Sequence, residues 1–399
     1  MATNTLKTLS DGDITNEALR ILKNANTILK KVNRQYDDRF AKEGAKNGGT
    51  IQIRLPNRYT VGTGATISAQ NTVETTTSVV VGTQYHVPVE FSSAELSLSL
   101  DNFSTRILKP AMSVLASKVA SQVALTAAQS FINYSGTPGT TPSSFLTYAN
   151  AGAALDWQTA PRDGARAAVL TPTAMAALAD AQKGLFHSAS QIEEGFEEGA
   201  MERMTGFDFV MDQSLASITH GAGASYTTHG TTPLTSGTAI MAIITGTGAI
   251  TAGQQFTIAG VYEVNPDTKL STGQLKVFTV ASDYAGGAGN LTLSQTIYTS
   301  GAYQNVSAAI PTTTALTLIG SASTAYPRNL AFHRDSIVLA TADLEVPKGV
   351  DMAYRSSMDG LSLRFVRQYT VGTDQWTGRF DIMCGFKVVR PEWGCVVYG

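Results

Sequence analysis

The residues best suited to chemistry are four glutamates that crowd one short segment of the chain. Glu193, Glu194, Glu197 and Glu198 lie close together in a stretch that Gly195 interrupts. Paired carboxylates can divide acid and base work at a scissile bond, or hold a divalent cation. Consecutive glutamates on a glycine-broken segment are more typical of a solvated face or of a contact between subunits. We therefore interpret the four as candidate intersubunit contacts.

A second motif, His333-Arg334-Asp335, has the residue order that opens the catalytic loop of protein kinases. That loop needs an asparagine where this chain has Ala340, and no Asp-Phe-Gly sequence follows. The five histidines are scattered without metal-ligand spacing, and no Gly-x-Ser-x-Gly elbow occurs. The sequence therefore predicts no catalytic residue, no metal site and no cofactor, and we do not expect an enzyme.

The charges of the chain are few and nearly balanced. Its 399 residues carry a formal net charge of −2, and 15% of them are charged. That balance provides no bulk attraction to nucleic acid or to an anionic membrane. A charge-poor surface suits a subunit that buries much of itself against copies of the same chain.

Targeting and redox features point to a cytoplasmic setting. The N-terminus has no basic and apolar leader, and no apolar run reaches the length of a membrane-spanning helix. The two cysteines, Cys384 and Cys395, lie in a strand-rich tail without metal or disulfide spacing. We expect both thiols to be reduced and partly buried, and we expect no membrane partner.

Residues 217–326 differ in composition from the sequence on either side. Only five side chains in this stretch are charged, and Gly, Thr and Ser are abundant. Short apolar runs separated by Gly, Asn and Ser indicate strands at near-regular spacing. We predict an inserted all-β sandwich or barrel that folds as its own domain. Its core faces are expected to include Phe256, Ile258, Val277 and Thr279.

Two elements are expected near the N-terminus. Helical spacing of apolar residues from Ile14 to Tyr36 predicts an amphipathic helix, either on the surface or as an arm docked on a neighbour. Residues 49–91 contain two β-rich stretches with little apolar content around a tight bend. They predict a long hairpin without a core, lying across another molecule. Its Arg54 and Arg58 are therefore candidate contacts to carboxylates of a neighbouring subunit.

The remaining sequence mixes helix and strand. From Pro110 to Tyr134 the only charge is Lys118, which predicts a spine helix buried on most of its circumference. Residues 167–171 predict a short buried strand that passes into a helix capped by Thr171. The segment 361–399 is strongly β. The chain is therefore expected to be an α+β protein that carries the all-β insertion.

Taken in order, these elements resemble the major capsid proteins of tailed bacteriophages with the HK97-type fold. Among them, the P22-type coat proteins carry an inserted β-barrel domain. Gln254-Gln-Phe-Thr-Ile-Ala-Gly-Val261 and Val277-Phe-Thr-Val280 look like that inserted domain. Arg379-Phe-Asp-Ile-Met-Cys-Gly385, with Arg390-Pro-Glu392, is similar to the end of the P22-type chain.

The resemblance implies an HK97-type capsid fold with axial and peripheral domains. Its expected parts are an N-terminal arm (1–48), an extended β-hairpin loop (49–91), a peripheral domain with the spine helix (92–150), a first axial part (151–216), the inserted β-barrel (217–326), and a second axial and peripheral part with C-terminal strands (327–399).

The implied function is that of a major capsid protein. Such a chain assembles into hexamers and pentamers of an icosahedral head that encloses double-stranded DNA, which it contacts non-specifically. The resemblance also implies a separate scaffolding protein and a portal, assembly in the host bacterial cytoplasm, and a final place in the virion. Two alternatives stay open at this point: an encapsulin-type compartment shell that holds protein cargo, and a secreted β-rich adhesin.

Overall fold

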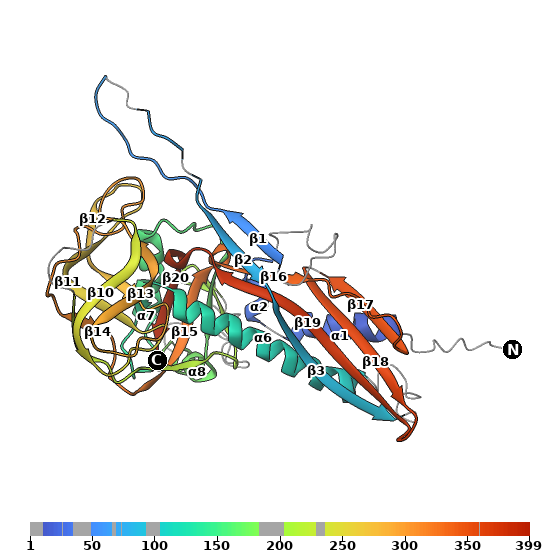
Figure 1. The fold of residues 1–399 in the computed structure, drawn as a ribbon. Coiled ribbons are helices and arrows are strands. Elements are labelled where there is room, and N and C mark those ends of the chain that lie inside the picture. The colour runs from blue at the N-terminus through green and yellow to red at the C-terminus, as the bar shows by residue number, and fades with distance from the viewer. Residues whose placement is uncertain are drawn as a thin grey trace. The chain divides into compact units, whose positions relative to one another are not determined.

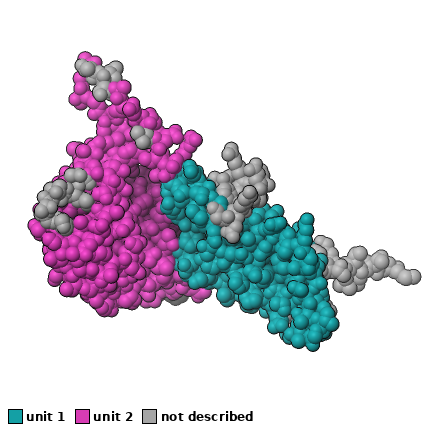
Figure 2. All heavy atoms as spheres, in the orientation of Figure 1, with its two compact units in different colours: residues 1–53, 77–122, 338–387 teal, residues 54–76, 123–337, 388–399 magenta. Residues whose placement is uncertain are grey.

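The computed structural model describes residues 11–25, 27–34, 49–65, 69–72, 74–92, 104–182, 203–228, 236–358 and 360–399. The described chain divides into two compact units (Figure 2). Unit 1 comprises residues 1–53, 77–122 and 338–387, and unit 2 comprises residues 54–76, 123–337 and 388–399. Each unit is therefore assembled from segments that lie far apart in the sequence.

Unit 1 is built on a five-stranded sheet. Strands β16 (Ile337–Ala342), β19 (Gln375–Val388), β18 (Leu361–Thr370) and β17 (Met352–Met358) follow one another, and β3 (Thr83–Ser92) also pairs with β19 (Figure 1). The rings of Phe365 and Phe380, which are register partners, stack with centroids 4.5 Å apart.

A buried carboxylate fixes the register of this sheet. Asp381 is fully buried on β19 and accepts hydrogen bonds from Arg364 (2.7 Å) on β18 and from Arg379 (2.6 Å) on its own strand. Burial alone would raise the pKa of Asp381, but hydrogen bonds from the two guanidinium groups hold it below its usual range. The carboxylate therefore stays charged and paired inside the sheet.

The predicted N-terminal helix is confirmed in part. It forms α1 (Asp11–Ala25) and the short α2 (Ile28–Lys31). Ile14, Ala18 and Leu22 are buried, and α1 packs on β17 and β18 of the same chain. The apolar stripe thus covers a sheet within unit 1, as helical periodicity requires.

The expected hairpin of Gly49–Phe91 needs correction. β1 (Gly49–Arg54) pairs only with β2 (Thr76–Val81), while β3 joins the five-stranded sheet. The hairpin base is not without a core, because alternate residues of both strands are buried: Ile51, Ile53, Val79 and Val81. The sequence concealed this core, since β1 contributes only two apolar residues, Ile51 and Ile53, and Val80, between the two buried valines of β2, is 57% exposed.

The spine helix is α6 (Lys109–Ser130), preceded by the single π-type turn Ser104–Leu108. By length and composition alone, Ser104–Ser130 is apolar enough to cross a membrane. One side of α6 is buried in packed protein, whereas Val114 on the other side is 64% exposed. The helix is therefore less fully covered than expected, and packing in a protein core accounts for its apolar composition.

Unit 2 contains a seven-stranded mixed sheet. Its order is β4 (Asn133–Ser135), β20 (Gly394–Tyr398), β15 (Ala325–His333), β5 (Arg166–Leu170), β7 (Phe207–Met211) and β6 (Arg203–Met204), and β8 (Ser217–Thr219) pairs with β15. Helices α7 (Phe145–Trp157) and α8 (Pro172–Gln182) contribute to the core of this sheet. The Thr171 hydroxyl accepts the Ala174 N–H, which confirms the predicted helix cap.

The inserted segment forms two three-stranded sheets in the part of the chain that the structure describes. One has the order β13 (Gly289–Ile297), β10 (Thr238–Thr247) and β9 (Ala224–Thr228), and the other β12 (Ser271–Thr279), β11 (Gln255–Val264) and β14 (Leu316–Leu318). Only isolated bridges join their edges, at Thr227 with Ala315 and at Val280 with Leu293. The described residues therefore do not form a closed barrel. The two sheets form a sandwich whose edges are joined by one isolated bridge on each side.

A single hydrophobic core fills the space between these sheets. All fifteen of its buried members lie between Tyr226 and Leu316. Phe256 and Phe278 are register partners whose rings stack at 5.5 Å. Phe256 and Ile258 are buried in this core as predicted, whereas Val277 is half-buried and Phe278 takes the core position. Thr279 is buried outside this core, where its hydroxyl donates to the Phe131 carbonyl. The strands at the two ends of the insertion, β8 and β15, pair from Ser217 with Pro327 to Thr219 with Ala325.

The two cysteines also follow the prediction. Cys384 and Cys395 are both free and buried. Burial raises the pKa of Cys384 to about 12 and also raises that of Cys395. Both thiols are therefore unreactive packing groups at neutral pH.

The core position of Phe256 gives a direct stability prediction. We expect Phe256→Ala to lower the free energy of unfolding of the insertion by about 3–5 kcal/mol, because it removes a fully buried ring. Tyr262→Ala on the same strand serves as the control, since Tyr262 is 39% exposed. Chemical denaturation measures both variants; equal losses would contradict the core assignment.

Candidate functional site

The motif His333-Arg334-Asp335 forms a structural turn. His333 is 1% exposed, and its Nδ1 accepts the Asp335 N–H (3.2 Å) while its Nε2 lies 3.1 Å from Asp163. Its ring also meets Trp393 edge-on. Because both ring nitrogens are engaged, the imidazole has no free site for proton transfer to a substrate.

The two predicted arginines have carboxylate partners within the chain. Arg54 lies 3.6 Å from Glu74, and both side chains are largely exposed, at 78% and 56%. Arg58 lies 3.4 Å from Glu392, and this pair is half-buried. Glu392 is 334 positions away along the chain, so no local pattern pointed to it. A contact from either arginine to a neighbouring subunit stays a prediction, and Glu193, Glu194, Glu197 and Glu198 lie outside the described residues.

The most developed polar arrangement of unit 2 is the junction between the insertion and the remainder of the unit, which we call the body. α6 ends at Ser130, and the last carbonyls of a helix have no partner inside it. Side chains of the insertion supply those partners. Thr279 Oγ1 donates to the Phe131 carbonyl (2.7 Å), Gln255 Nε2 to the same carbonyl (3.1 Å), and Ser294 Oγ to the Gln129 carbonyl (3.2 Å).

A second part of the junction joins the insertion to α7. Gln158, which follows the last residue of α7, donates through Nε2 to Glu263 Oε1 on β11. The ammonium of Lys276 on β12 lies 3.4 Å from the same oxygen. All three side chains are buried, so the carboxylate has both a counter-charge and a hydrogen bond in place of water.

The third part of the junction lies where the insertion joins the body. Arg328 of β15 is buried, stacks over Tyr398 at 4.1 Å, and hydrogen-bonds His220 Nε2 at 2.8 Å. The His220 ring also contacts Tyr326 edge-on at 4.7 Å. Burial and the adjacent Arg328 charge lower the pKa of His220 from 6.5 to about 4. His220 is therefore neutral at neutral pH, and its Nε2 accepts a hydrogen bond from the Arg328 guanidinium.

Together these contacts tie the insertion to the body at three separated places. They carry no nucleophile and base pair, and among the described residues no group of three or more His, Cys, Asp or Glu is placed to hold a metal. The block Gln254–Val261 is distinctive in the sequence, but its residue types do not predict the role of Gln255. Gln255 donates to backbone carbonyls, and these partners cannot be predicted from residue types because every residue carries a carbonyl.

Comparison with known proteins identifies the family. The family model described as "P22 coat protein - gene protein 5" matches residues 1–399. The chain therefore belongs to the P22 coat protein family, and it is a non-enzymatic major capsid protein of a phage head. No curated protein matches the chain.

Several solved structures are similar to the chain. A structure from Mycobacterium phage Che8 is 12% identical with a TM-score of 0.48, covering 93% of this chain and 90% of that one. The capsid of Ralstonia phage GP4 is 9% identical with a TM-score of 0.42, covering 90% and 85%. A virus-like particle from Pyrococcus furiosus is 8% identical with a TM-score of 0.41, covering 97% and 98%.

The cap on α6 predicts the effect of an isosteric substitution. We expect Thr279→Val to lower the free energy of unfolding by about 0.5–1.5 kcal/mol, because the buried Phe131 carbonyl loses its shortest hydrogen bond and keeps only that from Gln255. Thr317→Val is the control, since Thr317 is exposed on the same sheet. Denaturant titration of the full chain measures both; a Thr279→Val variant as stable as the control would argue against the cap.

The buried His220 predicts a pH dependence. Its folded pKa, about 4, lies below the ordinary 6.5, so the unfolded chain binds the proton more readily between these values. This residue's contribution to stability is therefore complete above pH 6.5 and is lost as the pH falls toward 4. His220→Gln, which keeps an acceptor for Arg328, should reduce the pH dependence of the melting temperature in that window.

The matched control for this titration is His86→Gln, because His86 is exposed on β3. It should leave the pH dependence of the melting temperature unchanged. If His220→Gln and the unmodified chain lose stability in parallel between pH 6.5 and 4, the assignment to His220 is wrong.

Proposed function

We propose that this P22-family coat protein assembles into hexamers and pentamers that close into an icosahedral head around double-stranded DNA. The observation that carries the proposal is the match of the family model to the whole chain. Shell formation repeats modest interfaces over several neighbours per subunit, so that contacts weak in isolation become stable together. The low content of charged residues, 15%, suits such repeated burial.

Within this proposal the fold is of the HK97 type, with axial and peripheral domains. Unit 1, with residues 109–122 of the spine helix and the sheet that contains β17, β18 and β19, corresponds best to the peripheral domain, and the body of unit 2 to the axial domain. The boundaries at residues 48, 91, 150, 216 and 326 remain our proposal for the division of the chain. The insertion is a two-sheet domain where a barrel was expected.

The segment between β1 and β2 is the proposed contact with a neighbouring subunit. It is an excursion without regular strands in its described part, crossed by a hydrogen bond from Thr60 N to Gln70 (2.9 Å) (Figure 1). Tyr59 and Val61 are 56% and 93% exposed. Exposed apolar side chains of this size suit burial against another copy of the chain, since few contacts within the chain cover them.

The insertion is proposed to act as a brace within the subunit. Its core is separate from that of the body, and its polar contacts close the end of α6 and the end of α7. This arrangement supports a role in setting the geometry of the body before and during assembly.

The remaining partners follow from the same proposal. A separate scaffolding protein and a portal would act with the coat protein in the host bacterial cytoplasm, and the coat protein would become part of the virion. Contact with the packaged DNA would be non-specific. A formal net charge of −2 is consistent with that, since it provides no bulk attraction to phosphate.

Assembly is the direct test of this function. We expect the full chain, co-expressed with its scaffolding protein, to form closed shells that electron microscopy resolves, because each subunit contributes to several interfaces. A species that stays monomeric at micromolar concentration with scaffold present would contradict the proposal.

Arg54 tests the proposed neighbour contact. Because its exposed pair with Glu74 is worth about 0–1 kcal/mol, Arg54→Glu should barely change the melting temperature while it reduces the yield of shells. The matched control is the swap Arg54→Glu with Glu74→Arg, which restores the pair within the chain. Assembly should remain impaired in the swap; full recovery would show that only the internal pair matters.

A further inference from the structure

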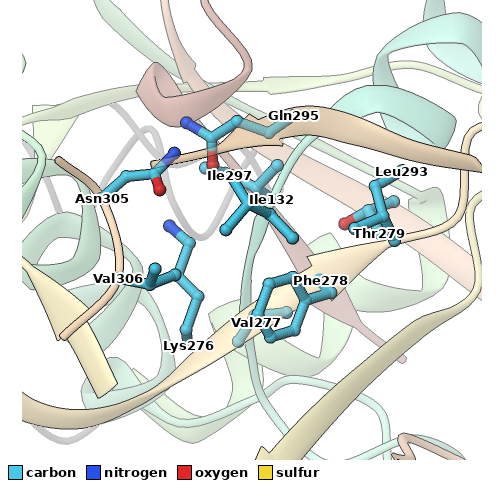
Figure 3. A pocket seen from close by; sticks show the side chains of 10 residues that line it. All are labelled: Ile132, Lys276, Val277, Phe278, Thr279, Leu293, Gln295, Ile297, Asn305 and Val306. Carbon is cyan, nitrogen blue, oxygen red and sulfur yellow. The ribbon is translucent and has the colours of Figure 1, made fainter. Parts of the chain in front are cut away.

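In the part of the chain that the structure describes, three Lys or Arg residues are almost completely buried, and one of them has no counter-charge. Arg166 pairs with Asp156 at 2.8 Å, and Lys276 lies 3.4 Å from Glu263. Figure 3 shows the Lys276 amine directed into a small pocket. Arg328 on β15 is 1% exposed, and no described carboxylate lies within ion-pair distance of it.

The groups that Arg328 does contact are neutral. Its Nη2 hydrogen-bonds His220 Nε2 at 2.8 Å, and its guanidinium lies 4.1 Å from the centroid of the Tyr398 ring. Its Nε and Nη1 are buried and have no hydrogen-bond acceptor in the chain. A guanidinium keeps its charge in proteins, so burial cannot neutralise it by removing a proton. The unpaired charge and the two unsatisfied donors both destabilise the fold as it stands.

A second unsatisfied donor lies on the insertion side of the same junction. Gln254 is 1% exposed, and its Oε1 accepts the N–H groups of Gly221 (3.3 Å) and Thr251 (3.4 Å). Its Nε2 is buried without an acceptor. Gly221 directly follows His220, which places this amide close to the Arg328 site along the chain. Because the unsatisfied groups of Arg328 and Gln254 are all donors, the missing partner is an acceptor.

The surrounding rings limit the size of that acceptor. His220, Tyr326 and Tyr398 are all buried, and their ring centroids lie 4.7 Å, 6.1 Å and 6.4 Å apart. A Cβ added at Gly320 would come within 2.8 Å of His220 and 2.9 Å of Tyr326. Such close packing excludes phosphate, sulfate and a side chain from another subunit. A water molecule is small enough, but it carries no charge to balance the guanidinium.

We propose that the junction binds one chloride ion beside the Arg328 guanidinium, which donates to it through an N–H group that has no acceptor in the chain. The ion supplies the counter-charge that Asp156 and Glu263 supply to the other two buried cations. Gln254 is the candidate second donor. The ion would stabilise the attachment of the insertion to the body in the free subunit, independently of shell assembly.

Thermal unfolding of the full chain tests the proposal. The melting temperature is measured at neutral pH while sodium chloride replaces sodium gluconate at constant ionic strength, because gluconate is too large for the site. Bound chloride should raise the melting temperature by about 3 °C for each tenfold rise in chloride above the dissociation constant. A melting temperature that does not depend on chloride overturns the proposal, and water would then be the partner of Arg328.

Two substitutions at one position separate a bound ion from a general effect of salt. His220→Glu places a carboxylate against Arg328 Nη2, so the chain carries its own counter-charge and the dependence on chloride should disappear. His220→Gln is the matched control, because it offers a neutral acceptor and should keep the dependence. Equal dependence on chloride in the two variants would overturn the proposal.

Removal of the charge is an independent test. Arg328→Met should also abolish the dependence on chloride, and circular dichroism checks that the variant has folded. A variant that folds and still gains stability from chloride, as the unmodified chain does, would show that the ion binds elsewhere and would contradict the assignment to Arg328.

Discussion

The end of the spine helix is the constraint on which unit 2 depends. α6 stops at Ser130, where its final carbonyls need partners because no further turn of helix provides them. Thr279, Gln255 and Ser294 reach these carbonyls from the insertion. Residues more than a hundred positions further along the chain therefore supply hydrogen-bond donors to the end of α6. These bonds form one part of the polar junction between the body and the insertion.

The insertion combines two requirements that are physically separate. Its own stability comes from an apolar core between two sheets, with Phe256 and Phe278 stacked at the centre. Its attachment comes from buried polar groups, which gain specificity because each unpaired partner would carry a desolvation cost. This division supports the proposal that the insertion acts as a brace for the body, with a core of its own.

Patterns of residues close together in the sequence predicted the features that depend on neighbouring residues: helices, strands and helix caps. Periodicity located α1 and the buried strand β5, composition located the insertion, and Thr171 was recognised as a cap. Long-range pairing left no such pattern: Arg58 meets Glu392, and β3 leaves the expected hairpin to pair with β19. Partners such as the Phe131 carbonyl are invisible in principle, because every residue carries the same backbone group.

The hydrogen bonds from Thr279, Gln255 and Ser294 indicate that the insertion stabilises the end of α6. Hydrogen exchange on a variant in which a short turn replaces residues 222–322 measures this directly, because β8 and β15 can still pair. We predict faster exchange for the amides of the last turn, including Phe131 N–H, which bonds Ala127, with little change near Leu115. Equal protection of the last turn with and without the insertion would show that the insertion does not stabilise the end of α6.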